Sequence, residues 1–362
     1  MASSERSVSS RSAVHWSTYL WILLAGSVVS FGAMAAFIAI VDPWKALPVS
    51  VPIDRPMSNN NQRLLYPMLV RTKNWDSFVF GSSTAMLIDP EKLGAGLGGR
   101  FANLALAGGL PWEQLDYLRF ILSQSPNPRA LMFAMDSGWC APTLVYGHDN
   151  PEHHKFPQWI YRELSWSNLR HVLNEEALFD ALNVVRYQVG RFKPDIRDDG
   201  YWVFPSYLTA YDPEAARRWL YGSAPRTPAK PIDPPVQIPD TEKLAWTFPW
   251  LDLLETALSP LNKSTGVLFV TMPVHVTAQA QPGSVAGQRD EACKQRTARI
   301  AAKHGSPVID MRFHSDMTRN DENYWDSLHY RIHVARRIEE LIIAALTGKS
   351  GPTPVLRIID AR

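Results

Sequence analysis

The sequence has few cysteines and no excess of charge. Cys140 and Cys293 are the only cysteines among 362 residues, and no C-x-x-C pair occurs. A metal–thiolate centre needs more ligands than these, so we expect no such metal site and no cofactor. One disulfide outside the cytoplasm and two unpaired thiols are both compatible with this count. The net charge of +2, without a basic cluster, argues against nucleic acid as a partner.

Charged residues are also absent from Trp16 to Ile40. A helix of these 25 residues would be about 37 Å long. That length can cross a hydrocarbon core of about 30 Å. No second apolar run of this length follows, so we predict one transmembrane helix over residues 16–40. Arg6 and Arg11 precede it, which places residues 1–15 in the cytoplasm and the rest of the chain outside.

Two alternatives to an anchor remain open for this apolar segment. Ala33-Met34-Ala35 resembles a signal-peptide cleavage site, although the apolar run continues beyond it. A buried core helix is the other alternative. Against both, Trp16, Tyr19 and Trp21 lie at one end of the segment and Trp44 just beyond the other, as aromatic residues do at membrane interfaces.

The remainder of the chain has the pattern of an α/β protein. Residues 41–73 are rich in Pro, Asn and Arg and are predicted to be an extended connector. Five short apolar strands follow, at Phe78–Phe80, Phe101–Leu106, Ala130–Met135, Val267–Met272 and Pro307–Ile309. Helical patterns alternate with them at Pro111–Ser123, Arg289–His304 and Ile332–Ala345. This alternation predicts a parallel sheet covered by helices on both faces.

We expect the α/β body to span residues 74–350, with a C-terminal tail over 351–362. Residues 138–262, between the third and fourth strands, differ in character and hold much of the Trp, Tyr and Arg content. We interpret them as a mainly helical insertion that could cover the edge of the sheet.

Two short motifs stand where a parallel sheet presents its catalytic loops. Ser83 follows the first strand in the run Gly81-Ser82-Ser83, where a turn would lift its hydroxyl to the rim of the sheet. Asp326 and His329 lie three residues apart before the last helix. Asp326 could hold His329 through Nδ1 and leave Nε2 free to take the proton of Ser83. Taken singly, each motif is more typical of a helix cap.

The order of Ser83, Asp326 and His329 resembles the SGNH (GDSL-like) hydrolases. That resemblance implies a three-layer α/β/α fold with a flavodoxin-like sheet, and a Ser-His-Asp triad for acyl chemistry. The second block of the family, an Asn with a downstream Gly, is similar to Asn103 and Gly108. The resemblance implies that the backbone N–H of Gly108 or a neighbour donates to the oxyanion.

One block departs from the family pattern. The family has an Asn after the third strand that donates to the oxyanion, and Asp136 stands at that position here. An ionised Asp136 cannot donate a hydrogen bond, so the strength of the oxyanion hole is in question. His275, just after the fourth strand, is a further candidate for a substrate contact or for the base. The run His148–His154 contains metal-type ligands, but its proline and crowding favour a solvated loop.

An anchor, a divergent SGNH-like body and the changed third block together resemble bacterial envelope acyl-transfer proteins. Those include the D-alanine transfer protein of teichoic acids and the O-acetylation proteins of alginate. The resemblance implies a periplasmic or otherwise extracytoplasmic body on the cytoplasmic (inner) membrane, a polysaccharide or acylated glycan substrate, and a multi-span acyltransferase partner. The alternative is an inactive SGNH-like scaffold that binds glycan or that partner.

Overall fold

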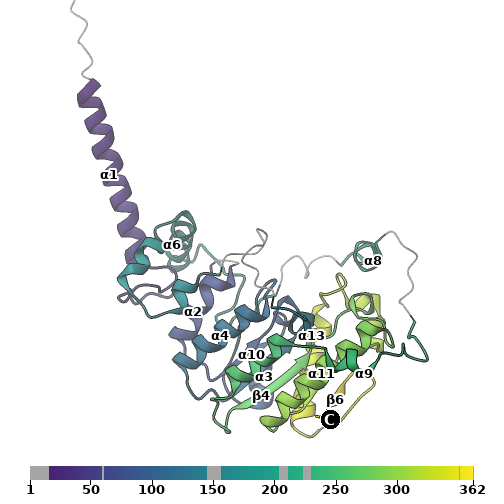
Figure 1. Ribbon diagram of the computed structural model, residues 1–362. Helices are drawn as coiled ribbons and strands as arrows, with labels where there is room; N and C mark the ends of the chain where they lie inside the picture. Colours follow the sequence, from purple (N-terminus) through teal and green to yellow (C-terminus); the bar gives the residue numbers. More distant parts are fainter. Residues whose placement is uncertain are drawn as a thin grey trace, which may run out of the picture.

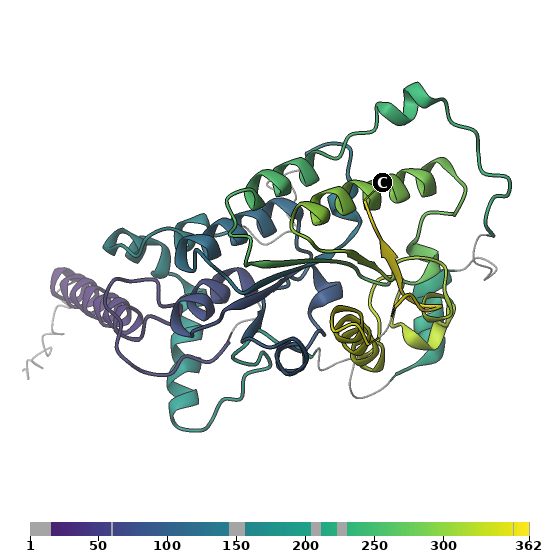
Figure 2. The same ribbon diagram turned by 90° about the horizontal axis from the view of Figure 1, so that it is seen from below.

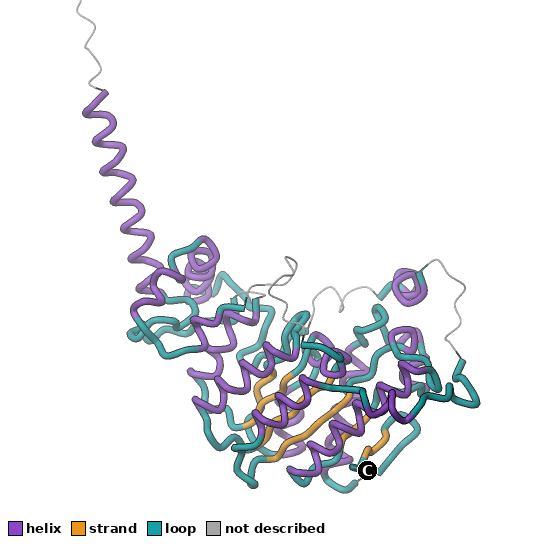
Figure 3. The backbone as a smooth tube through the Cα atoms, viewed as in Figure 1, coloured by secondary structure: helices purple, strands orange, loops and turns teal. Residues whose placement is uncertain are grey.

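The computed structural model describes residues 16–58, 61–144, 156–203, 211–222, 230–349 and 351–361. Its centre is a six-stranded sheet, drawn in orange in Figure 3. The strands are β1 (Ser77–Phe80), β2 (Phe101–Asn103), β3 (Ala130–Met135), β4 (Gly266–Thr271), β5 (Val308–Asp310) and β6 (Arg357–Ile359). Their order is β2-β1-β3-β4-β5-β6, with β6 antiparallel to β5 and all other pairs parallel. The parallel part has the flavodoxin-like order 2-1-3-4-5.

Helices cover both faces of the sheet, which makes three layers (Figure 2). One face carries α3 (Pro90–Leu97) and α13 (Ile332–Leu346), and the other carries α4 (Pro111–Gln124), α10 (Pro249–Leu258) and α11 (Val285–Lys303). Side chains alternate between the faces along each strand. In β1, Phe78 and Phe80 enter the core under α4 and α10, whereas Val79 enters the core under α3 and α13. The three-layer α/β/α fold predicted from the sequence is therefore confirmed.

The apolar segment near the N-terminus forms one straight helix, α1 (Trp16–Val41), which leaves the body in Figure 1. By length and composition it can cross a membrane, and it is the one such helix among the described residues. Its side chains are exposed as far as Ala33, and Ile38 and Val41 near its end are buried. Arg6 and Arg11, on which the predicted orientation depends, lie outside the described residues.

Two segments differ from the expected extended connector and tail. Within 41–73, Gln62–Thr72 form the helix α2, despite an internal proline at Pro67. Residues 62–70 of α2 are all buried, because the helix lies between the body and the segments around Tyr161. In the predicted tail, residues 357–359 form β6 and extend the sheet beyond β5.

The stretch between β3 and β4 is mainly helical but is not a single cap. Its α10 belongs to the helix layer beside α4, and α6 (Glu175–Gln188) packs against the end of α1. Its other elements are η2 (Ser137–Cys140), η4 (Gln158–Tyr161), η5 (Trp166–Asn168), α5 (Leu169–Val172), α8 (Pro213–Tyr221) and α9 (Asp240–Leu244). The remaining short helices are η1 (Ser83–Ala85), η6 (Val276–Ala278), α12 (Asp316–Arg319) and η7 (Asp321–Asn323).

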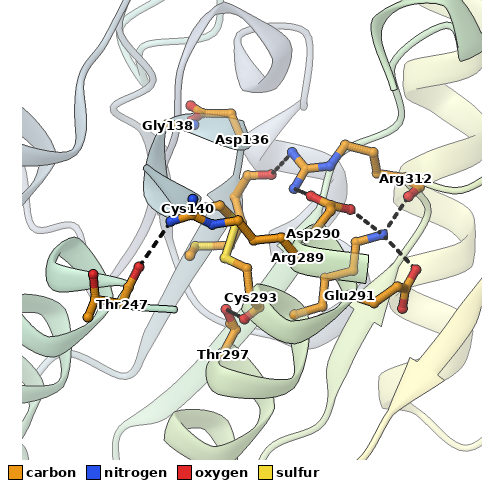
Figure 4. Close-up of a disulfide and its surroundings, with 12 residues drawn as sticks. Asp136, Gly138, Cys140, Thr247, Arg289, Asp290, Glu291, Cys293, Thr297 and Arg312 are labelled. Atoms are coloured by element: carbon orange, nitrogen blue, oxygen red, sulfur yellow. Dashed lines mark hydrogen bonds and ion pairs between the residues drawn. A yellow bond between two sulfur atoms is a disulfide. The ribbon is translucent and has the colours of Figure 1, made fainter. Parts of the chain in front are cut away.

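The two cysteines form a disulfide, a pairing that the sequence left open. Cys140 in η2 is bonded to Cys293 in α11, with a Cα–Cα distance of 5.6 Å and a sequence separation of 153 (Figure 4). The bond ties the loop that follows β3 to the helix layer beside β4. The disulfide therefore fixes the position of one of the loops at the carboxyl edge of the sheet.

Candidate active site

Ser83 lies at the carboxyl edge of the sheet, at the start of η1. The strand β1 ends at Phe80, and Gly81 makes the turn. A Cβ atom at Gly81 would lie 2.7 Å from Cβ of Ala85 and 3.0 Å from Cβ of Ala134, so only glycine fits between η1 and β3. The turn leaves Ser83 partly exposed at the rim.

His329 and Asp326 complete a continuous hydrogen-bonded chain with Ser83. The Ser83 Oγ lies 2.8 Å from Nε2 of His329, and His329 Nδ1 lies 2.7 Å from Oδ2 of Asp326. The other carboxylate oxygen of Asp326 accepts the backbone N–H groups of Leu328 and His329, both at 2.8 Å. The structure thus brings together the three residues that the sequence predicted, 246 residues apart for Ser83 and His329.

Asp326 is held in its ionised form. Burial opposes the charge, but the hydrogen bond and charge of His329, together with the two backbone N–H groups, lower the pKa of Asp326 below its usual value. The ionised carboxylate of Asp326 accepts a hydrogen bond from the N–H at Nδ1 of His329. The lone pair on Nε2 of His329 is then directed at the hydroxyl of Ser83. The arrangement therefore has the geometry of a nucleophile, its base and the residue that orients the base.

Neighbouring contacts fix the loop of Asp326 and His329 against the turn of Ser83. The Trp325 N–H donates to the His329 carbonyl at 2.8 Å and closes the loop. Tyr330, whose side chain is buried, donates its hydroxyl to the carbonyl of Thr84, the residue after Ser83. The base and the nucleophile are therefore held together by a second contact beside their own hydrogen bond.

Ser83 and Gly108 both line the same cleft of about 1280 Å³. Gly108 has a φ of +59°, a conformation that favours glycine, in the loop that follows β2. Leu106 N–H donates to the Gly81 carbonyl at 3.0 Å and fastens this loop to the turn before Ser83. Within the described chain, neither the Ser83 nor the Gly108 N–H has a protein acceptor, so both are available to an oxyanion.

Asn103, which the family resemblance made a candidate for the oxyanion or substrate site, lies away from the cleft. Its side chain is fully buried and does not line the cleft formed by the described residues. Its Nδ2 donates to the carbonyls of Ala85 and Ile88, at 2.8 and 2.9 Å, and its Oδ1 accepts the Ala105 N–H at 2.9 Å. Asn103 therefore joins the segment after Ser83 to the loop of Gly108 and positions both.

Asp136 lines the cleft after β3, beside the turn of Ser83. Phe80 and Phe133 are register partners in β1 and β3, and Ser83 and Asp136 each lie three residues beyond this pair. One carboxylate oxygen of Asp136 accepts the Gly138 N–H at 2.8 Å, and the other is buried near the side chain of Ser82.

Burial changes the expected protonation of Asp136. Burial raises the pKa of this carboxyl, against the opposing effects of the Gly138 N–H, the charge of Arg312 and the side chain of Ser82. Arg312 itself lies between the Met135 carbonyl, at 3.3 Å, and Asp290, at 3.6 Å (Figure 4). A neutral carboxyl carries an O–H and can donate a hydrogen bond, which the ionised form cannot.

His275 lies at the predicted edge of the sheet but turns away from the cleft. Its side chain is fully buried, with Nδ1 2.9 Å from the hydroxyl of Thr277 and Nε2 3.3 Å from Asp321. Burial lowers the pKa of His275 against the effect of Asp321, so the neutral form is favoured. Its backbone N–H donates to Ser327 at 3.0 Å. His275 therefore supports the loop of Asp326 and His329, and the expected substrate contact is not observed.

Two residues of α2, which the sequence analysis missed, hold the loop of Gly108. Tyr66 donates its hydroxyl to the Ala105 carbonyl at 2.7 Å, and Arg63 donates to the Ala107 carbonyl at 3.2 Å. Arg63 also forms a buried, bidentate ion pair with Glu113 of α4, at 2.5 and 2.9 Å. A helical apolar spacing of Leu65 and Leu69 was the one available signal for this helix.

Among the residues that the structure describes, no three His, Cys, Asp or Glu side chains are grouped as metal ligands. The run His148–His154 lies outside the described residues.

No protein-family model matches the chain, and no curated protein matches it. Three chains of solved structures match. One is the crystal structure of a Bacteroides fragilis NCTC 9343 protein whose printed description is "putative acylhydrolase". Its sequence identity is 12%, the match covers 76% of this chain and 89% of that chain, and the TM-score is 0.36. A likeness at this level says nothing about the activity of this chain.

Proposed function

We propose that this protein is a membrane-anchored, extracytoplasmic serine acyltransferase or esterase that acts on acyl groups of envelope polysaccharide. The observation that carries the proposal is the unbroken chain of hydrogen bonds from Ser83 through His329 to Asp326, with distances of 2.8 and 2.7 Å. Both distances lie in the range expected between a nucleophile, its base and the group that orients the base.

In the proposed reaction, Ser83 Oγ attacks the carbonyl carbon of an acyl donor while its proton passes to Nε2 of His329. The Ser83 and Gly108 N–H groups donate to the developing oxyanion. Collapse of the tetrahedral intermediate releases the donor alcohol, which takes the proton from His329, and leaves an acyl-serine. His329 then accepts a proton from a sugar hydroxyl, whose oxygen attacks the acyl-serine and frees Ser83. Water in place of the sugar gives hydrolysis.

Two features support an extracytoplasmic body on a bacterial inner membrane. The helix α1 has the length and composition of a membrane span. The Cys140–Cys293 disulfide is typical of oxidising compartments, because cytosolic thiols are kept reduced. The orientation with residues 1–15 in the cytoplasm remains part of this proposal.

The size and charge of the cleft support a glycan substrate with acidic groups. At about 1280 Å³ the cleft exceeds the roughly 300–1,000 Å³ of sites for small ligands. Lys243, Arg289 and Arg319 line it, and none of them has a carboxylate partner within the described residues. A multi-span acyltransferase is the partner that we propose as the source of the acyl group.

A serine-reactive phosphonate probe tests the proposed nucleophile. We expect the probe to label the full chain and Ser82→Ala but not Ser83→Ala. Ser82 lies in the same turn and lines the same cleft, so it is a matched control for local changes. Mass spectrometry of the labelled peptide would identify the modified serine. Equal labelling of the Ser83→Ala and unsubstituted chains would refute the proposal.

The alternative function, an inactive scaffold, predicts a different result in cells. If Ser83→Ala leaves polymer acylation unchanged while deletion of the protein abolishes it, the protein acts as a scaffold and not as an enzyme. We expect instead that Ser83→Ala and the deletion both abolish acylation, because both remove the proposed acyl-serine.

We further expect the rate advantage of an Asp136→Asn variant to grow with pH. Because the pKa of Asp136 is raised, its neutral form persists above the usual carboxyl range and is lost as pH rises through that pKa. An Asn donates at every pH. One oxyanion donor contributes about 10²–10³-fold in rate, which bounds the gain. The measurement is kcat/KM for a neutral aryl acetate from about pH 5 to about pH 9. Parallel profiles for the two proteins would show that Asp136 does not donate.

A further inference from the structure

We propose that α6 lies in the membrane interface, as a second contact between this protein and lipid. The proposal rests on α1 crossing the membrane, which is part of the proposed function, and it does not depend on the catalytic residues. Four properties of the described residues support it: the depth of α6 along α1, its direction, its exposed apolar side chains and its charges.

The depth of α6 follows from its contacts with α1. Ala181 and Val184 of α6 form a small core with Val41 and Phe37 at the end of α1. Twenty residues of helix from Trp16 span about 30 Å, which is the thickness of the hydrocarbon core. Phe37 and Val41 follow directly after such a span. The contacts therefore place α6 at the boundary between acyl chains and headgroups.

The direction of α6 is also that of a helix lying on a membrane surface. Figure 1 shows α6 nearly end-on beside the foot of α1, which runs upward, and Figure 2 shows it from the side. In both views α6 crosses the direction of α1. A helix that crosses a membrane span at its foot lies along the plane of the membrane.

The face of α6 that points away from the body carries exposed apolar side chains, with Glu175 and Arg186 beside them. Asp180 faces the body, because its carboxylate accepts the indole N–H of the buried Trp44 at 2.7 Å. At about 100° per residue, Leu182 and Val189 lie on the opposite side of the helix from Asp180. The exposed fractions of the large apolar side chains are 55% for Phe179, 37% for Leu182, 41% for Val185 and 62% for Val189.

The charges at the end of α6 favour a lipid surface over an apolar protein groove. Arg186, Arg191 and Lys193 are exposed, and none of them forms an ion pair within the described part of the chain. The acidic residues Glu175 and Glu176 lie at the opposite end of α6. Basic residues beside exposed apolar side chains are the composition of helices that bind anionic lipid. An interfacial α6 would limit rotation of the body about α1, and so set the orientation of the cleft relative to the membrane.

Depth-dependent fluorescence quenching tests this proposal on the full chain. Single cysteines replace Leu182 or Val189 and carry a nitrobenzoxadiazole label. Cys140 and Cys293 do not react with the label, because they are disulfide-bonded. The labelled protein is reconstituted into vesicles of phosphatidylcholine and phosphatidylglycerol that contain a nitroxide at a shallow or a deep acyl position. Leu23→Cys reports on α1, and Leu244→Cys, which is 85% exposed on α9 away from α1, is the matched control (Figure 1).

We expect the labels at positions 182 and 189 to lose most of their fluorescence with the shallow nitroxide, and less with the deep one. The label at position 23 should respond most to the deep nitroxide, and the label at position 244 to neither. If position 23 is quenched while 182 and 189 behave like 244, the lipid contact of α6 is refuted, and a protein would be its occupant. If position 23 is not quenched either, the anchor itself fails and the proposal fails with it.

Discussion

An Asp326→Asn variant is expected to hydrolyse an activated ester with kcat/KM lowered by about 10⁴-fold, the loss known for this substitution in other serine triads. The substitution preserves the fold of the loop. An Asn Oδ1 can still accept the N–H groups of Leu328 and His329, which Asp326 accepts at 2.8 Å. Its amide group, however, would donate to Nδ1 of His329. The proton of the imidazole would then reside on Nε2, which could no longer accept the proton of Ser83.

Asp321→Asn is the control for this prediction. Asp321 lies in the neighbouring η7 and contacts a second histidine, the buried His275, and the hydroxyl of Tyr221. Loss of the Asp321 carboxylate should change kcat/KM by less than about tenfold, because Asp321 does not orient His329, the base that accepts the proton of Ser83. Circular dichroism of both variants would establish that the fold is retained. An Asp326→Asn rate within tenfold of the unsubstituted chain would exclude His329 as the base.

The strands could be predicted from the sequence because they are buried on both sides. A strand of this kind is a continuous apolar run between turns, and β3 was predicted and observed at the same residues, Ala130–Met135. The candidate site could be predicted for a related reason. Residues after the carboxyl ends of parallel strands share one edge, which brings Ser83 to the loops of the later strands. The partnership of Ser83 with His329 was inferred from the position of both motifs at this edge, and the family resemblance added to that inference.

The side chains that turned inward could not be predicted. His275 follows β4 and Asn103 ends β2, both at the correct edge of the sheet. Their buried side chains are held by Asp321 and by the carbonyls of Ala85 and Ile88. For α2 the obstacle was a buried charge. A charged side chain such as Arg63 is expected to be exposed, which argues against a buried helix at this position. The ion pair with Glu113 that makes its burial possible can be seen only in the three-dimensional structure.

The path from α1 to the candidate site gives α2 a mechanical role. From the end of α1 the chain reaches α2 within about twenty residues, and Tyr66 and Arg63 of α2 donate to carbonyls on both sides of Leu106. The loop of Gly108 is therefore fixed from the segment that leaves the membrane helix. The helix α2 and the loop of Gly108 therefore form one hydrogen-bonded unit.

Removing Arg63 is expected to be the most destabilising single change in this unit. Arg63→Met would leave the carboxylate of Glu113, which is 3% exposed, without its bidentate partner. Breaking a buried ion pair in this way costs about 3–5 kcal/mol in the free energy of unfolding. Urea unfolding in detergent, followed by tryptophan fluorescence, would measure it. The exposed pair of Arg119 and Asp116, at 2.8 Å, is the control, and Arg119→Met should cost at most about 1 kcal/mol.

The double variant Arg63→Met, Glu113→Leu separates stability from function at this pair. It removes both charges, so most of the lost stability should return. The Ala107 carbonyl would still lack the donor that Arg63 supplies at 3.2 Å, and Leu110 would lose the Glu113 oxygen that accepts its N–H at 2.8 Å. The loop of Gly108 would then be held by Tyr66 alone from this side. We therefore expect the double variant to be stable but to have a lowered kcat with little change in KM, because the oxyanion exists only in the transition state and the intermediate. A double variant with unchanged kcat would show that α2 supports the fold and does not position Gly108.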